Sequence, residues 1–239
     1  MKKILTTAIL CAGLVGFTAC DSFLDEEPKS SLTLDTYYKT SADIIGNVNY
    51  LYRDGAPDKM GNMTGAYRGS SLSVMNMVTG YFVNEYEGQE VDCSYARQLT
   101  RQNFTQSCCN YLTNDTWKGC YKSINVANAV IKYVDGVEMD GQAQYKAEAR
   151  FFRALNYFYL VKMFGDVPMI TEPTEDATLV EYPARTAASE VYKTVIIPDL
   201  QFAVENLPDA TFAGNSHRVT KYAADMLLAD VYMRLGEYA

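Results

Sequence analysis

The sequence has a single histidine and a single tryptophan among its 239 residues, and it lacks the common catalytic motifs. His217 has no cysteine or carboxylate motif beside it, so neither a metal site nor a nucleophile–base pair is expected there. The motifs G-x-S-x-G, H-E-x-x-H and the phosphate-binding loop are all absent. We therefore expect no catalytic residue, no cofactor and no metal, and we treat the histidine as an ordinary loop residue.

The six cysteines contain no C-x-x-C pair, which argues against a zinc site. Cys120 falls on the apolar face of an expected helix, where a buried free thiol is the favoured state. An exported protein could also oxidise its cysteines, and their pairing cannot be deduced from sequence. The state of four residues is therefore left open: Cys93, Cys108, Cys109 and Cys120.

The apolar stretch at the N-terminus is too short to cross a bilayer. It covers the 16 residues Ile4–Ala19 and follows two lysines, which is typical of a signal peptide. Phe17-Thr18-Ala19-Cys20 resembles a lipobox, in which the Cys20 thiol receives diacylglycerol before cleavage. We predict a lipoprotein signal peptide at 1–19 and lipidation at Cys20; ordinary cleavage near Ala19, giving a soluble secreted protein, is the alternative.

Basic residues are outnumbered throughout. The whole chain has a formal charge of −8, and without residues 1–19 it has 19 basic and 29 acidic residues, a charge of −10. Such a chain is not expected to bind nucleic acid or an anionic membrane by charge. Residues 20–40 are predicted to form an acidic leader in which Asp25, Glu26 and Glu27 are the charge cluster.

Helical periodicity dominates the rest, and no strand pattern rivals it, so we predict a mainly α protein with long loops. Apolar residues recur at three- and four-residue intervals between Trp117 and Val134. Helices are expected near 41–52, 117–134, 142–164, 187–206 and 220–235. Ser41 is the expected N-cap of the first, and Pro198 is expected to kink the fourth.

The helix at 142–164 is apolar nearly all round, so it should be buried. Three charged residues lie on it: Glu148, Arg150 and Arg153. Buried charges must be paired, because desolvation is costly. We assign these residues to helix packing and not to ligand binding.

The last helix contains part of a repeat. Leu228-Ala229-x-x-Tyr232, followed by Gly236, matches the first helix and turn of a tetratricopeptide repeat. The second helix of that repeat is not in the sequence, so we expect the chain to be incomplete after Ala239. Without a partner helix, an apolar stripe should face water; its expected members are Leu227, Leu228, Val231 and Leu235.

Five blocks in fixed order resemble the SusD/RagB family of Bacteroidota lipoproteins. They are CDSFLDEEP at 20–28, WKGCYKSINVAN at 117–128, EARFFRALNYF to FGDVP at 148–168, Arg185 to Leu207-Pro208, and RVTKYAA leading to Leu228-Ala229. The resemblance covers essentially the whole chain after Cys20. It implies a SusD-like α-helical domain at 41–239 with tetratricopeptide-like hairpins, truncated relative to family members of about twice this length.

The resemblance also implies a function. Family members sit on the outside of the outer membrane, capture oligosaccharides, or peptides in some branches, and act without catalysis beside a SusC-like TonB-dependent barrel. The cluster Asp25–Glu27 resembles their surface-export tag, with a solvated linker as the alternative. A helical-repeat scaffold lipoprotein for outer-membrane assembly is the competing hypothesis for the whole chain.

A polar-aromatic segment before the Trp117 helix is the candidate ligand site. In relatives, some aromatic ligand contacts come from a loop at this position. Aromatic faces stack on sugars, and an amide can both donate to and accept from hydroxyls. Four residues are the candidates: Tyr81, Phe82, Asn84 and Tyr86. Loop packing or contact with the barrel is the alternative role.

Four acidic residues follow closely in the same segment: Glu85, Glu87, Glu90 and Asp92. Two of them could act as a glycosidase pair, or several could hold calcium, although the EF-hand order is absent. A solvated acidic loop is the favoured interpretation.

Overall fold

The computed structural model describes residues 33–54, 78–81, 97–98, 100–103, 105–175 and 183–237, without the side chains of Asp54 and of 106–115. This part of the chain is mainly helical, as the sequence predicts. Its main elements are α2 (Leu34–Tyr37), α3 (Ser41–Asp54), α6 (Gln106–Tyr133), α7 (Gln142–Phe164), β1 (Val167–Pro168), β2 (Arg185–Thr186), α8 (Ala188–Val191), α9 (Ile197–Asn206) and α10 (Lys221–Leu235).

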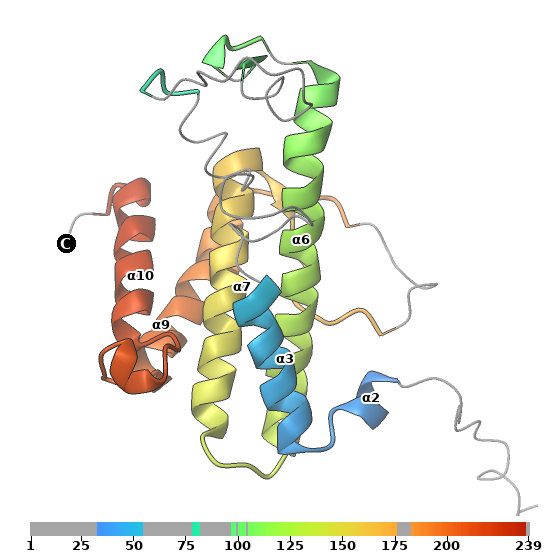
Figure 1. Cartoon of the computed structure of the whole chain (residues 1–239), viewed down its shortest axis with the longest axis vertical. Coiled ribbons are helices and arrows are strands. Elements are labelled where there is room, and N and C mark those ends of the chain that lie inside the picture. Colours follow the sequence, from blue (N-terminus) through green and yellow to red (C-terminus); the bar gives the residue numbers. More distant parts are fainter. Residues whose placement is uncertain are drawn as a thin grey trace, which may run out of the picture.

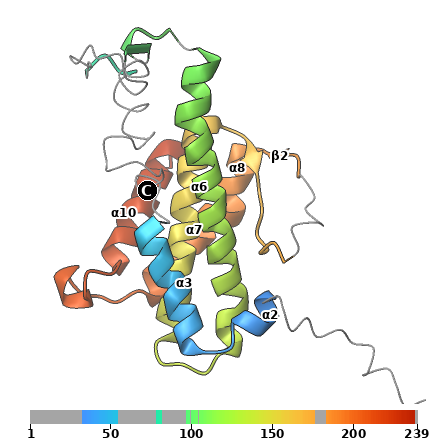
Figure 2. The same ribbon diagram turned by 45° about the vertical axis from the view of Figure 1, so that its right-hand side comes forward.

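The long helices α6 and α7 lie side by side, with α3 packed against both of them (Figure 1). On its other side α7 contacts α9, and α10 packs on α9 as the outermost helix (Figures 1 and 2). A one-turn helix, Val134–Gly136, follows α6 directly. The Gln142 amide donates to the carbonyl groups of Val134 and Val137, so the first residue of α7 closes the connection between the two helices.

Helix α7 is the centre of the core, and its predicted burial is confirmed. Its bounds are those expected from sequence, and side chains on all its faces are buried, from Ala147 to Val161. Gly165 ends the helix with φ +68°, and its N–H donates to the Val161 carbonyl at 3.0 Å. A residue with a Cβ is strained at that φ, which explains the glycine.

The N-cap of α3 is Thr40, whereas the sequence analysis expected Ser41. The carbonyl of Thr40 accepts the first helical bond from Ile44. Its hydroxyl and N–H both donate to the Asp43 carboxylate, at 2.7 and 2.8 Å. Asp43 lies three residues after Thr40, where its carboxylate can accept from the cap residue, whereas the residue three positions after Ser41 is Ile44. The side-chain partner therefore favours Thr40 as the cap. The expected inward face of α3 is confirmed, because Ile44, Val48 and Leu51 are fully buried.

Residues 33–40, which the sequence places in the acidic leader, include α2 and a buried aromatic residue. The Tyr38 ring stacks on Tyr133 at 5.2 Å between centroids, nearly parallel. Residues 1–32 lie outside the described part of the chain, so the signal peptide and most of the leader remain predictions.

Pro198 distorts its helix, as predicted. A π-helical turn, Tyr192–Ile196, separates α8 from α9, and the Ile197 N–H donates to the Tyr192 carbonyl five residues earlier. Proline has no N–H for the usual bond to residue 194, so the wider turn accommodates the missing donor.

The pair of short strands was not expected from sequence. Val167 pairs with Thr186, and Pro168 with Arg185, in antiparallel register. Two-residue strands are too short to produce an alternating pattern.

The exposed stripe predicted on α10 was assigned to the wrong residues. Val231 is fully buried, and Leu227 and Leu228 pack against the core. Only Leu235, at the end of the helix, is exposed. Because the inner face already packs on α9, the other exposed apolar residues of α10, which are Tyr222, Met226 and Met233, lie on the opposite face.

Candidate ligand-binding site

Tyr81 lies at the end of a turn, Val78–Tyr81, and its side chain is 89% exposed. Gly80 has φ +79°, which lets the chain reverse, and the Tyr81 N–H donates to the Thr79 hydroxyl at 3.2 Å. The local hydrogen bond fixes the backbone while the ring faces solvent. This geometry leaves the faces of the ring available to a ligand.

The turn is fastened to the segment that leads into α6. The Gln102 amide donates to the Val78 carbonyl at 3.3 Å, and Gln102 itself has φ +52°. Within that segment the Thr105 hydroxyl donates to the Gln98 side chain at 2.7 Å. Both segments lie at the N-terminal end of α6, far from α3 (Figure 1). Tyr81 is thus positioned on the side of the molecule where α6 begins.

Of the four candidate ligand residues, the structure describes only Tyr81. Phe82, Asn84 and Tyr86 lie outside the described residues, as do Glu85, Glu87, Glu90 and Asp92. Tyr81 occupies the surface position that the sequence predicts, but whether the four residues come together stays a prediction. Cys20, the predicted lipidation site, also lies outside the described part.

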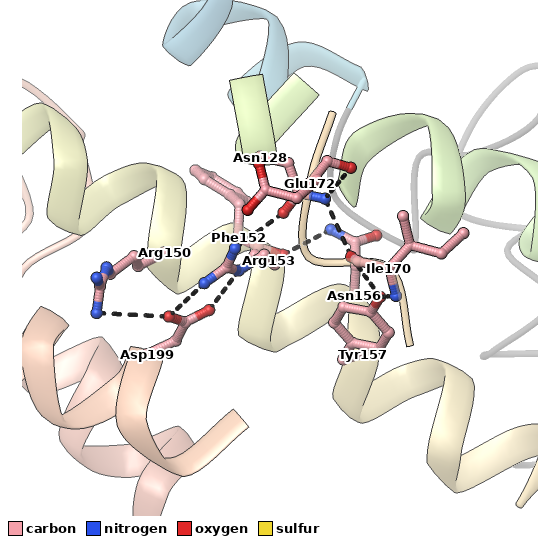
Figure 3. A network of polar contacts seen from close by, with 9 residues as sticks. All are labelled: Asn128, Arg150, Phe152, Arg153, Asn156, Tyr157, Ile170, Glu172 and Asp199. Atoms are coloured by element: carbon pink, nitrogen blue, oxygen red, sulfur yellow. Dashed lines mark hydrogen bonds and ion pairs between the residues drawn. The ribbon is translucent and has the colours of Figure 1, made fainter. Parts of the chain in front are cut away.

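A buried polar network that joins α7 to α6 and α9 confirms that the charges of α7 serve packing (Figure 3). The Arg153 guanidinium donates to both carboxylate oxygens of Asp199 on α9, at 2.7 and 2.9 Å. Arg150 approaches the same carboxylate at 3.7 Å, and Arg153 also donates to Asn128 of α6 at 2.9 Å. Burial raises the pKa of Asp199, and the two arginines oppose that rise.

The same network holds the irregular segment after β1 against α6 and α7. The Tyr157 hydroxyl donates to the Ile170 carbonyl at 2.8 Å and accepts the Ile170 N–H at 2.7 Å. The Asn128 amide donates to the carbonyls of Ile170 and Glu172 (Figure 3). The Tyr121 hydroxyl donates to the Pro168 carbonyl at 2.7 Å. The donors are polar groups within otherwise apolar stretches of α6 and α7, and no pattern in the sequence indicates that they bind this segment.

Glu148, the third charge of α7, is fully buried and pairs with Arg218 from the loop before α10. The Arg218 Nε lies 3.0 Å from both carboxylate oxygens, and its guanidinium lies over the Tyr52 ring at 4.7 Å. The Tyr52 hydroxyl donates to Glu148 and accepts the Val219 N–H. Residues of α3 and α7 therefore bind the segment that leads into α10, and these polar groups are engaged with one another.

The described residues contain no cluster of three metal-binding side chains. His217 lies exposed in the loop before α10, with φ +61° and its ring edge-on to Phe212. Cys120 is a buried free thiol, as expected, and burial raises its pKa to about 12. None of the helices in the described part has the length and apolarity needed to cross a bilayer.

Comparison with known sequences matches this chain to SusD-like proteins. Residues 22–233 match the SusD-like family described as starch-binding and associating with the outer membrane. The SusD-like protein P2 of Formosa agariphila is 30% identical over 241 aligned residues, which cover all of this chain and 44% of that protein.

Solved structures agree with the sequence match. A laminarin-binding SusD-like protein shares 26% identity, with a TM-score of 0.69 over 84% of this chain and 41% of its own. A protein crystallised with a xylogluco-oligosaccharide shares 25%, with a TM-score of 0.60 over 79% of this chain and 34% of its own. The chain thus spans less than half the length of these relatives. With a family match over residues 22–233 and the same helical architecture, this chain belongs to the SusD-like family.

Proposed function

We propose that this chain is part of a glycan-binding lipoprotein of the cell surface that contacts its ligand through Tyr81. The observation that carries the proposal is the solvent-facing Tyr81 ring on a hydrogen-bonded turn before α6. The laminarin-binding relative and the relative crystallised with a xylogluco-oligosaccharide support a neutral glycan as ligand. A peptide is the less favoured ligand.

Tyrosine suits this role because it combines a large apolar face with a polar hydroxyl. The C–H surface of a sugar can lie on the ring while the hydroxyl remains hydrogen-bonded. One ring covers only one side of a sugar, so strong binding requires further walls. Phe82, Asn84 and Tyr86 are the residues of this chain that we propose complete the contact.

The test is binding of laminarin- and xyloglucan-derived oligosaccharides by calorimetry. Tyr81→Ala should weaken binding by about two- to tenfold, because aromatic contacts contribute roughly 0.5–1.5 kcal/mol. Tyr81→Phe should keep most of the affinity, since the face remains. Phe212→Ala is the matched control, because Phe212 is another exposed aromatic residue but lies in the loop before α10. Equal affinity of wild type and Tyr81→Ala would refute the assignment.

We further propose that Cys20 anchors the protein in the outer membrane. The support is the short apolar stretch at 4–19 and the small residues Thr18 and Ala19 before the cysteine. In the native host, Cys20→Ala should shift the protein from the membrane to the soluble fraction and abolish palmitate labelling. Cys93→Ala is the control that removes a thiol elsewhere. Labelling that persists in Cys20→Ala would overturn this anchor.

The partner that we propose is a SusC-like TonB-dependent barrel, and the role is ligand capture without catalysis. Family membership supports both points. Cross-linking in intact cells followed by mass spectrometry should recover such a barrel, and incubation with laminarin should release no new reducing ends.

The alternative is a scaffold lipoprotein that faces the periplasm. Protease treatment of intact cells separates the two, because only a surface protein is cut. Protection from protease would favour the scaffold.

A further inference from the structure

Gln102 has a backbone conformation that is unusual for glutamine. The chain is helical at Arg97, Gln98 and Thr100. It leaves the helix through Gln102, whose φ of +52° lies in the left-handed region. The Asn103 N–H donates to the Gln98 carbonyl, five residues back, at 2.9 Å, which is the bond that closes a Schellman motif. Gln102 thus occupies the left-handed position of that motif, where glycine is the most common residue because it has no Cβ.

The bend at Gln102 is fixed by hydrogen bonds around it. The Arg101 N–H donates to the Arg97 carbonyl at 3.0 Å, and the Thr105 hydroxyl donates to the Gln98 side chain at 2.7 Å. Gln98 therefore stabilises the bend through both its carbonyl and its side chain. A residue with a Cβ stays in the left-handed region only where its surroundings hold it there.

The side chain of Gln102 makes a contact that glycine could not make. Glycine would meet the backbone requirement at position 102 without strain, but it has no group that could reach a neighbouring segment. The Gln102 amide donates to the Val78 carbonyl at 3.3 Å, across 24 residues of sequence. Val78 begins the turn that ends at Tyr81, and the Tyr81 N–H is bound to the Thr79 hydroxyl. Gln102 thus links this turn to the segment that leads into α6.

We propose that Gln102 is a positioning residue for Tyr81. Its amide holds the Val78 end of the turn, and through the turn it fixes the direction in which the Tyr81 ring meets a glycan. Fixing the ring before the ligand arrives reduces the conformational entropy that is lost on binding. Gln102 acts through Tyr81 and not by contact with the ligand, so this inference rests on the proposed glycan contact of Tyr81.

Opposite effects on stability and on affinity are the signature of this role. Gln102→Gly removes the amide and relieves the strained φ, so the mature protein should melt no lower than wild type. Its affinity for laminarin- and xyloglucan-derived oligosaccharides should nevertheless fall by about two- to tenfold, and by no more than that of Tyr81→Ala. Unchanged affinity, or a loss of affinity that accompanies a lowered melting temperature, would contradict the proposal.

Gln102→Glu tests the hydrogen bond itself, because it keeps the length of the side chain but replaces the donor by an oxygen that can only accept. It should weaken glycan binding as Gln102→Gly does. Gln201→Glu is the matched control and should leave binding unchanged, because Gln201 is an exposed glutamine of α9 whose amide makes a 3.3 Å bond to Tyr232. In the Tyr81→Ala background, Gln102→Glu should cause no further loss. Losses that add would show that Gln102 acts independently of Tyr81.

A measurement without ligand separates the positioning role from the glycan contact. Chymotrypsin cleaves after tyrosine, and the rate of cleavage after Tyr81 in the native protein depends on how often the turn opens. Mass spectrometry should show this cleavage about two- to tenfold faster in Gln102→Glu than in wild type, and unchanged in Gln201→Glu. Equal rates in wild type and Gln102→Glu would overturn the positioning role. Faster cleavage together with unchanged glycan binding by Tyr81→Ala would reject the glycan contact and leave Gln102 as the residue that holds the turn.

Discussion

At the scale of single residues, the charges that the sequence puts on apolar helices are accommodated by specific partners. Asp199 receives two arginines, and Glu148 receives Arg218 together with the Tyr52 hydroxyl. Removing one partner of such a pair leaves an uncompensated buried charge, which is much more costly than losing an exposed pair. These residues therefore belong to the scaffold and would be poor choices for probing ligand binding.

The Cys120 thiol provides a test of core integrity at this scale. Burial raises its pKa to about 12, so almost no thiolate forms in the folded protein below pH 10. Iodoacetamide should therefore alkylate Cys120 slowly between pH 7 and 9 in the native state and faster with rising pH in urea, where the thiol titrates normally. The alkylated Cys120 peptide can be followed by mass spectrometry. Equal rates with and without urea would show that this part of α6 is open.

At the scale of elements, the periodic pattern of α7 predicts only part of its observed burial. The spacing of Phe151, Leu155 and Phe158 predicts one shared core face, and the two phenylalanines are indeed buried. Leu155 is only partly buried, whereas Leu160 is completely buried. Spacing along a helix tells which residues share a face, but how deeply each is buried depends on the neighbouring helices.

Leu160→Ala should therefore lower the free energy of unfolding by about 2–5 kcal/mol, because it removes a large buried side chain and leaves a cavity. Leu155→Ala, the same change five residues earlier, should cost clearly less. Urea denaturation followed by circular dichroism measures both values. If Leu155→Ala proved the more costly substitution, the position of the core along α7 would be wrong.

At the scale of the whole molecule, the cluster around Arg218 joins parts of the chain that are far apart in sequence. Arg218 contacts Asn49 of α3 and Glu148 of α7, 169 and 70 residues away. The cluster fixes the point at which the chain enters α10. The position of α10 thus depends on this ion pair as well as on its contact with α9.

Arg218→Ala should destabilise the fold by about 3–5 kcal/mol, since Glu148 is left buried without its cation. Amide hydrogen exchange in α10 should accelerate more than in α6. Lys193→Ala, which removes an exposed cation from the π-helical turn, is the control and should change neither quantity. Adding Glu148→Gln to Arg218→Ala should recover part of the stability, and a double variant no more stable than Arg218→Ala would argue against the ion pair as the cause.

The sequence by itself determined the main helices, the burial of α7, the irregularity at Pro198 and the family, because periodicity and motif spacing are local properties. It did not predict α2, and it placed the start of α6 near Trp117, whereas the helix begins at Gln106. It also placed Tyr81 at the surface. Only the tertiary structure decided that Thr40 caps α3, that Glu148 pairs with Arg218, and that Leu227, Leu228 and Val231 of α10 face the core. These outcomes depend on which helix covers which face, and on side chains that compete for one partner from opposite ends of the chain. The cap, the ion pair and the buried face are set by packing and desolvation in the folded protein, which a local sequence pattern does not contain.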